Sequence, residues 1–290
     1  MKLKPVLCFG EIVWDALPAG IFLGGAPLNV AYHLNCLGRP GLPVSRVGDD
    51  FLGEETLRRL HGKGVSDELI QTDDDLPTGA VVVDLDPAGD ARYDIREPAA
   101  WDAIEATEKL LHAGGKAAAL VYGSLALRKD VNRVALSALL EAAPVRLCDV
   151  NLRAPFDDRE RVLEWAAKAT HVKLNGEELD RLSPVSTGEG LEKALAALAE
   201  TTGVGHFILT RGGEGAHVWK EGRFLSAPVP EVEVADTVGA GDAFTAAYLD
   251  AFLKGEEASD CLERAVELGA YVAGRNGAQP DYDKKAPAKP

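Results

Sequence analysis

The chain has 290 residues, of which 46% are hydrophobic and 27% are charged, so it can bury an extensive core and is too apolar to be a disordered polymer. Its 31 Lys and Arg residues against 46 Asp and Glu residues give a net charge of −15. A surface this anionic repels phosphate backbones and anionic lipid headgroups. We therefore expect neither a nucleic acid nor a membrane as a partner, and we attribute most of the negative charge to solubility.

The amino-terminal part of the sequence predicts no secretory signal. Its apolar run, residues 6–9, has only four residues, and the longest apolar run, residues 117–127, is interrupted by Gly123 and Ser124. The four cysteines lie far apart and form no C-x-x-C pair, which favours reduced thiols. We expect a cytoplasmic protein with one large domain over residues 1–280 and a flexible, solvated tail over residues 281–290.

Short β-prone runs alternate with amphipathic helical stretches along most of the chain. This alternation predicts an α/β fold of three layers, α/β/α, in which helices cover both faces of a mostly parallel sheet. In chain order, the pattern predicts strands at 6–9, 117–122, 145–150, 171–174 and 207–210, and helices at 28–37, 130–142, 159–169, 190–201, 240–253 and 259–273.

Two segments interrupt this alternation. Residues 12–23 contain two β-prone pieces separated by Pro18, Ala19 and Gly20, and residues 80–96 are typical of a hairpin that turns at 87–90. Together they predict a small β lid over a cleft, although edge strands of the main sheet would fit the same pattern equally well. Pairing of the lid strands across a two-fold axis would hide their edges, which predicts a homodimer.

The most informative motif is DTVGAGD, residues 236–242, which lies between an alternating strand expected at 231–234 and the helix at 240–253. The amides of Gly239, Ala240 and Gly241 at the start of a helix would attract a phosphate. Asp242 in the same turn would repel that phosphate if it were only a cap, so its better use is to accept a proton from an attacking alcohol. Taken alone, a structural glycine turn explains the motif about as well.

The signatures of P-loop NTPases, dinucleotide-binding domains, zinc proteases and esterases are absent from the sequence. DTVGAGD followed by AFTAAYL instead resembles the carboxy-terminal signature of the ribokinase-like, or PfkB, carbohydrate kinases. GGAPLNVAYHLNCLG, residues 24–38, resembles their amino-terminal signature. The resemblance implies a ribokinase-like fold, ATP and Mg²⁺ as cofactors, Asp242 as the general base and the amides of Gly239, Ala240 and Gly241 as an anion hole.

The resemblance also implies a sugar site that contains Asp15, Gly24, Gly25 and Asn29. The two glycines would let a polyol lie against the backbone, and a carboxylate can accept two hydroxyl hydrogen bonds. A solvated surface aspartate and an ordinary amide near a helix start are the alternatives for Asp15 and Asn29.

The segment DVNLR, residues 149–153, ends a strand at the edge where ligands collect in parallel sheets. Fructokinase-like members carry a similar segment near the substrate, so Asn151 and Arg153 are further candidates for the sugar site. A pair of salt-bridged residues at the end of the sheet explains the segment equally well.

Residues 175–178 resemble the N-x-x-E motif of these kinases. It implies that Asn175 reaches a nucleotide phosphate and that Glu178 organises hydrated Mg²⁺. Glu177 is a rival for the same role, and helix capping alone is an alternative explanation for both glutamates.

Further resemblances concern the nucleotide. Thr210, Gly212 and Gly215 match a turn that borders ATP, although a plain hairpin turn explains the glycines equally well. Asn276 lies in a segment similar to the loop that contacts adenine. Many members bind a monovalent cation beside the anion hole, and Asp236 is the candidate for K⁺ here.

Taken together, these features predict an ATP-dependent sugar kinase with fructose as the leading substrate, because GEIVWD, GGAPLNVAYHL and DVNLR look most like fructokinases. Kinases for ribose, 2-keto-3-deoxygluconate or adenosine are alternatives within the family. A non-catalytic regulator that binds sugar or nucleotide on the same fold is an alternative of another class. The complete GAGD turn argues against it, because a protein that only binds gains nothing from a well-placed base.

Overall fold

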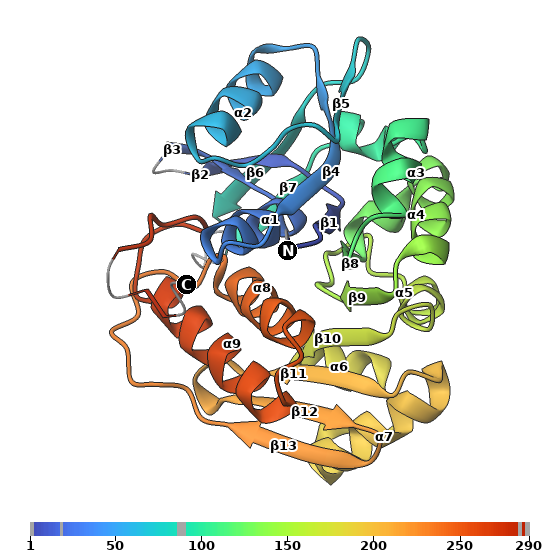
Figure 1. Ribbon diagram of the computed structural model, residues 1–290, viewed down its shortest axis with the longest axis vertical. Coiled ribbons are helices and arrows are strands. Elements are labelled where there is room, and N and C mark those ends of the chain that lie inside the picture. Colours follow the sequence, from blue (N-terminus) through green and yellow to red (C-terminus); the bar gives the residue numbers. More distant parts are fainter. Residues whose placement is uncertain (1–2, 18–19, 86–90, 284–285, 288–290) are drawn as a thin grey trace.

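The computed structural model describes residues 3–17, 20–85, 91–283 and 286–287. Within them, nine strands form one central sheet in the order β13-β12-β11-β10-β9-β8-β1-β4-β5 (Figure 1). The strands from β5 to β11 in this order are parallel, and β12 and β13 add an antiparallel edge. Their bounds are β1 Val6–Phe9, β4 Gly41–Gly48, β5 Ile70–Asp73, β8 Ala119–Gly123, β9 Val145–Asp149, β10 His171–Asn175, β11 His206–Thr210, β12 Ala216–Lys220 and β13 Arg223–Ala227.

Helices cover both faces of this sheet, because its central strands are apolar on both sides. In β1, Leu7 and Phe9 belong to one hydrophobic core and Val6 and Cys8 to the other. The first core is closed by α3 (Glu108–Gly114), α4 (Asp130–Ala142), α5 (Arg159–Ala166), α6 (Gly176–Leu182) and α7 (Leu191–Thr202). The second is closed by α1 (Ala26–Cys36), α8 (Ala240–Leu253) and α9 (Ala258–Ala273). The predicted three-layer architecture is confirmed.

A second sheet of four strands stands apart from the first, in the order β3-β2-β6-β7. Its strands are β2 (Val13–Leu17), β3 (Gly20–Gly24), β6 (Gly79–Leu85) and β7 (Ala91–Ile95), and residues 86–90 of the predicted turn lie outside the described residues. The alternative of edge strands in the main sheet is therefore wrong. The two hairpins are joined by a parallel pairing of β2 with β6.

The lid sheet is fixed to the body by a tryptophan. Trp14 of β2 is buried, and its indole N–H lies 2.9 Å from Thr56 Oγ1 on α2 (Phe51–Gly62). Arg59 of the same helix stacks over the Trp14 ring at 4.6 Å. These contacts hold the inner strand of the lid in place relative to the main sheet.

The structure differs from the sequence-based expectation at residues 231–234, which form no strand. Val234 is 60% exposed, and Val232 packs near Gly274, where an added Cβ would lie 2.8 Å from Val232 Cγ2. The alternation of apolar residues there reflects an extended chain that passes over the end of α9. The helix expected from residue 28 begins at Ala26, since Pro27 is favourable in a first helical turn.

The prediction of a solvated tail from residue 281 is wrong at Tyr282 and Ala286. The Tyr282 hydroxyl lies 2.9 Å from His33 Nδ1, and its ring packs against Tyr32 and Tyr271. Ala286 is buried and belongs to the second hydrophobic core, to which α1, α8 and α9 contribute. The late segment of the chain therefore packs against α1. Among the described residues, no helix is long and apolar enough to cross a membrane.

Candidate active site

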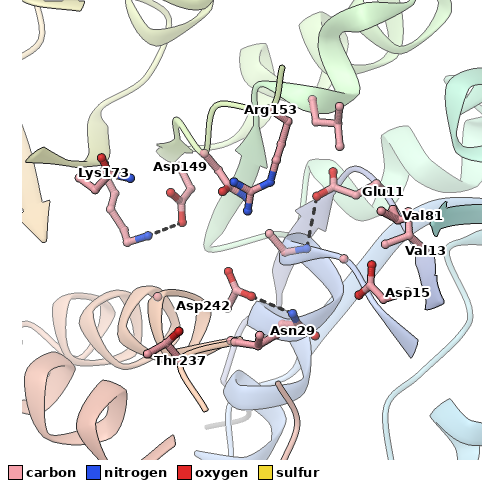
Figure 2. A pocket seen from close by; sticks show the side chains of 18 of the residues that line it. Glu11, Val13, Asp15, Asn29, Val81, Asp149, Arg153, Lys173, Thr237 and Asp242 are labelled. Carbon is pink, nitrogen blue, oxygen red and sulfur yellow. Dashed lines mark hydrogen bonds and ion pairs between the residues drawn. The ribbon is translucent and has the colours of Figure 1, made fainter. Parts of the chain in front are cut away.

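A cavity of about 470 Å³ opens at the carboxyl ends of the parallel strands, between the main sheet, the lid and the start of α8 (Figure 2). Ligands bind at this edge in open α/β sheets. The cavity brings together many of the residues predicted from the sequence: Asp15, Gly25, Asn29, Asn151, Arg153, Asn175, Glu178, Thr210, Gly239, Gly241 and Asp242. Val13, Val81 and Ile95 of the lid supply apolar walls.

Asp242, in the first turn of α8, is held by a chain of amides. Asn29 Nδ2 donates to Asp242 Oδ2 at 2.8 Å, and Gln279 Nε2 donates to Asn29 Oδ1 at 2.9 Å. Burial raises the pKa of Asp242 from 3.8 to about 7, and the Asn29 hydrogen bond opposes the rise. A carboxylate with this pKa is suited to accept a proton near neutral pH.

The turn before Asp242 presents backbone amides to the cavity. Gly239 is the N-cap of α8 with φ 78°, and no side chain caps the helix. The Ala240 amide donates a long bond of 3.3 Å to Thr237 O. Within the described residues, the Gly239 and Gly241 amides have no hydrogen-bond partner. The turn therefore offers two free amides and one weakly engaged amide, at the positive end of the α8 dipole.

Gly239 also has a packing role that the sequence did not reveal. A Cβ at Gly239 would lie 2.5 Å from the Cα of Ala278, and its φ of 78° disfavours other residues. The turn and the segment after α9 are thus in backbone contact.

A buried ion pair forms the floor between Asp242 and the strands. Lys173 Nζ lies 2.7 Å from Asp149 Oδ2, and the hydroxyl of Thr245 donates to the same oxygen at 3.1 Å. An added Cβ at Gly241 would lie 3.5 Å from Lys173 Nζ. Sequence analysis singled out neither Asp149, which opens the DVNLR segment, nor Lys173. Their signal was available, because Asp149 is the last residue of β9 and Lys173 lies in the adjacent strand β10, two residues before its polar end at Asn175.

Asp15 of β2 faces the cavity from the lid. Burial raises the pKa of Asp15 to about 6, and Arg153 opposes that rise. Gly24 itself does not line the cavity. It leaves room for the aspartate, since a Cβ at Gly24 would lie 2.8 Å from Asp15 Oδ2.

Gly25 is required by its backbone. Its φ is 113°, and an added Cβ would lie 2.3 Å from the carbonyl oxygen of Glu11. The entry into α1 can therefore approach the loop after β1 only with glycine at this position.

Asn151 and Arg153 follow β9 and line the cavity. Asn151 adopts φ 41°, a left-handed conformation that asparagine tolerates. The Arg153 guanidinium points into the space framed by Asp149 and Glu11 (Figure 2). It makes no ion pair within the described residues; the salt bridge considered for the end of the sheet is made by Asp149 with Lys173 instead.

Glu11 is a cavity residue that the sequence analysis missed. It lies directly after β1, is only 5% exposed, and accepts the Ala26 amide on Oε1 at 3.3 Å. Burial raises its pKa to about 7, although the Arg153 charge opposes the rise. The only sequence signal was its place in GEIVWD, four residues before Asp15.

Asn175 and Glu178 form a capping box at the start of α6, which matches the capping alternative. Glu178 N donates to Asn175 Oδ1 at 2.9 Å, and Asn175 N donates to Glu178 Oε2 at 2.8 Å. Glu178 Oε1 also accepts the Leu152 amide at 2.8 Å. Glu178 is buried and lines the cavity, whereas Glu177 is exposed and does not. The register therefore favours Glu178 over Glu177.

A second cavity, of about 310 Å³, lies on the other side of the GAGD turn. Its walls are mostly apolar and include Val232, Phe244 and Ala270, together with the predicted Thr210, Gly212, Gly215 and Ala240. Thr210, Thr237 and Gly241 line both cavities. The two spaces therefore meet at the amides of the turn, next to Asp242.

Two predicted residues are placed differently. Asn276 is exposed and lines neither cavity. Asp236 accepts the Val238 amide on Oδ1 and the Gly277 amide on Oδ2, both at 3.0 Å, so it joins the GAGD turn to the loop after α9. Within the described part of the chain, no three Asp, Glu, His or Cys side chains are grouped to hold a metal ion by themselves.

Comparison with known proteins identifies the family. The model of the pfkB family carbohydrate kinases matches residues 16–285. The chain belongs to this family. The kinase is 31% identical to the fructokinase of Rhizobium leguminosarum bv. trifolii over 261 residues, 84% of this chain and 78% of that protein. It is 30% identical to the fructokinase of Escherichia coli, over 84% of this chain and 83% of that protein.

Solved structures agree with the fold. The kinase matches a fructokinase from Vibrio cholerae O395, in a form that holds fructose, ADP and a potassium ion, with a TM-score of 0.82 and 25% identity over 96% of this chain and 94% of that one. An aminoimidazole riboside kinase from Salmonella enterica matches with a TM-score of 0.78 and 22% identity over 95% of each chain. The predicted ribokinase-like fold and the predicted carbohydrate kinase activity are confirmed.

Proposed function

We propose that this kinase transfers the γ-phosphoryl group of ATP to a hydroxyl of fructose. The observation that carries the proposal is the pair of cavities that meet at the GAGD turn, because Thr210, Thr237 and Gly241 belong to both. A polar cavity beside a carboxylate suits a sugar, and an apolar cavity beside it suits a nucleotide base. The similarity to fructokinases favours fructose among sugars.

In this reaction Asp242 removes the proton from the sugar hydroxyl as its oxygen attacks the γ-phosphorus. The Gly239 and Gly241 amides, with that of Ala240, stabilise charge on the transferring group, and ADP leaves toward the apolar cavity. Alignment and neutralisation of charge are the main demands of phosphoryl transfer. Asn29, which binds the base, also lies where a sugar hydroxyl would reach it.

We propose that Mg²⁺ accompanies ATP and is held through water by Glu178. Each Glu178 oxygen accepts one backbone N–H, which leaves lone pairs free for metal-bound water and disfavours direct ligation. Bound Mg²⁺ would neutralise phosphate charge. Asn175 would contact a phosphate. A K⁺ site near Asp236 and an adenine contact by Asn276 remain proposals from the family resemblance. Asp236 would act there by holding the two loops together.

We also propose a homodimer through the lid and a cytoplasmic location. Ile21 and Phe22 of β3 are 57% and 45% exposed on the lid, and burial of such side chains would favour pairing of two lids. Sedimentation equilibrium at micromolar concentration tests the dimer, and a monomer alone would contradict it.

The four free cysteines, three of them buried, suit the reducing compartment of the proposed cytoplasmic location.

The test of function is an ADP-release assay with Mg²⁺ and ATP, in which fructose, ribose, 2-keto-3-deoxygluconate and adenosine are compared by kcat/KM. We expect fructose to give the highest value and Asp242→Asn to slow release at least about a hundredfold with every acceptor. A higher value for another acceptor would replace fructose. Folded protein that is silent with all four, yet binds sugar or ATP in calorimetry, would support the non-catalytic regulator instead.

A further inference from the structure

Glu11 lines the sugar cavity, and the proposed chemistry gives its carboxylate no role. It lies in the loop between β1 and β2, where the backbone packs closely against the start of α1 on both sides of Glu11. A Cβ at Gly10, with φ 149°, would lie 2.7 Å from Pro27 Cγ, and a Cβ at Gly25 would lie 2.3 Å from the Glu11 carbonyl oxygen. These close contacts fix the backbone of Glu11 beside the start of α1, so the position of its side chain is constrained.

One oxygen of this carboxylate has a structural partner. Glu11 Oε1 accepts the Ala26 amide at 3.3 Å, and Ala26 is the first residue of α1, whose N-cap, Gly25, has no side chain. Glu11 thus caps α1 from a neighbouring segment, in the way that an N-cap side chain would. This role occupies Oε1 and leaves Oε2 unexplained.

The other oxygen has none. Oε2 is buried and finds no hydrogen-bond partner anywhere in the described residues, and the residue as a whole is 5% exposed. A buried polar atom without a partner is costly and calls for an explanation. Glu11 lines the same cavity as Asp15, Asn29 and Asp242 (Figure 2), so a ligand in that cavity is within its reach.

We propose that Glu11 Oε2 forms a hydrogen bond with a hydroxyl of the sugar, which makes Glu11 a substrate-binding residue of this kinase in addition to Asp15 and Asn29. The proposal rests on the proposed function, since it requires a polyhydroxylated acceptor in this cavity. A sugar carries several hydroxyl groups, so one molecule can form hydrogen bonds with all four of these polar side chains. In this bond the ionised Glu11 accepts the hydroxyl hydrogen through Oε2, which an NH₂ group cannot do.

The test is Glu11→Gln, which keeps an amide oxygen to accept from Ala26 while it replaces Oε2 by an NH₂ group. We expect the KM for fructose to rise about tenfold or more, because bonds to charged groups are worth most, and the KM for ATP to stay within about twofold. Glu141→Gln on α4 is the matched control. Glu141 is exposed and does not line the cavity. Its substitution by Gln removes the same charge as Glu11→Gln.

A substrate series separates direct contact from a structural effect. Wild type and Glu11→Gln are assayed with monodeoxyfructoses, each of which lacks one hydroxyl. If Glu11 contacts one hydroxyl, the analogue that lacks it binds poorly to wild type and loses nothing more in the variant. A KM for fructose in Glu11→Gln within about twofold of wild type, or equal added losses for every analogue, would overturn the proposal.

Two further arms make each outcome decisive. Thermal melting of Glu11→Gln reports whether α1 has kept its cap. If that variant does not fold, Glu11→Asp, which retains the charge but withdraws the carboxylate by one methylene, carries the same series with the same expectations. Wild type that phosphorylates no sugar at all would instead refute the proposed function, a result independent of any Glu11 variant.

Discussion

Replacement of Asp242 by asparagine should make the protein almost inactive and, above neutral pH, more stable. Burial raises the pKa of this carboxyl from 3.8 to about 7, and each pKa unit corresponds to about 1.4 kcal/mol between folded and unfolded states. An ionised Asp242 therefore costs the folded state up to about 4 kcal/mol above pH 7. Solvent reaches the half-buried carboxylate, and we expect screening to reduce the cost to about 2 kcal/mol.

The pH dependence of this effect has a definite direction. At a pH of about 2.5 or below, the carboxyl is protonated in both states, and wild type and Asp242→Asn should be equally stable. As the pH rises, the unfolded chain ionises first, so wild type loses stability until about pH 7 and the difference from the variant is then complete. At a pH of about 5.5 the difference should be about half of its final size.

Urea denaturation at these pH values measures the difference, with Asp74→Asn as a control on an exposed aspartate. Turnover in the ADP-release assay should fall by at least about a hundredfold, the usual contribution of a general base, and calorimetry should show that ATP binding is largely retained. A variant no more stable than the control at a pH of about 8 would refute the burial argument. A variant with near-normal turnover would remove Asp242 as the base.

Three further predictions follow from the site. The kcat/KM for fructose should fall about tenfold per pH unit below about pH 7, where the general base becomes protonated; a flat profile down to a pH of about 5 would contradict this. Gly25→Ala should destabilise the protein by more than about 2 kcal/mol in urea, because the new Cβ would lie 2.3 Å from a carbonyl oxygen at φ 113°. Gly62→Ala, where nothing lies within 4 Å, should be neutral or stabilising. Gln279→Leu, which removes the hydrogen bond to Asn29 Oδ1, should shift the acid limb of kcat to higher pH, since a mobile Asn29 amide no longer lowers the pKa of the base. An ionised Gln279→Glu cannot donate this hydrogen bond and should shift the acid limb of kcat in the same direction as Gln279→Leu. An unshifted acid limb in both variants would show that Gln279 does not position Asn29.

Periodicity predicted the central strands and the long helices because their burial follows from local pattern alone. The helices over 130–142 and 240–253 begin and end where the sequence places them. The strand expected at 231–234 failed for a physical reason. Alternation of apolar residues shows which side chains face an apolar environment, but it does not show that a neighbouring strand supplies it. Val232 lines the second cavity instead of pairing within a sheet.

The sequence motifs predicted the residues of the site better than their partners. Asp242 and Asn29 lie in the two signatures, and Asp15 followed from the resemblance of GEIVWD to the family. The amide chain from Gln279 through Asn29 to Asp242, and the single-sided cap made by Glu11, could not be read from spacing. Each depends on which segments the fold brings into contact, and residues far apart in sequence leave no local pattern.

The contact between Asn29 and Gln279 joins positions 250 residues apart, and it has a consequence for how the molecule is made. A chain emerging from the ribosome can form its early βα units one by one. The Asn29 amide, which orients Asp242, gains its Gln279 partner only when residue 279 has been synthesised. The complete set of hydrogen bonds around the general base therefore forms only in a nearly finished polypeptide.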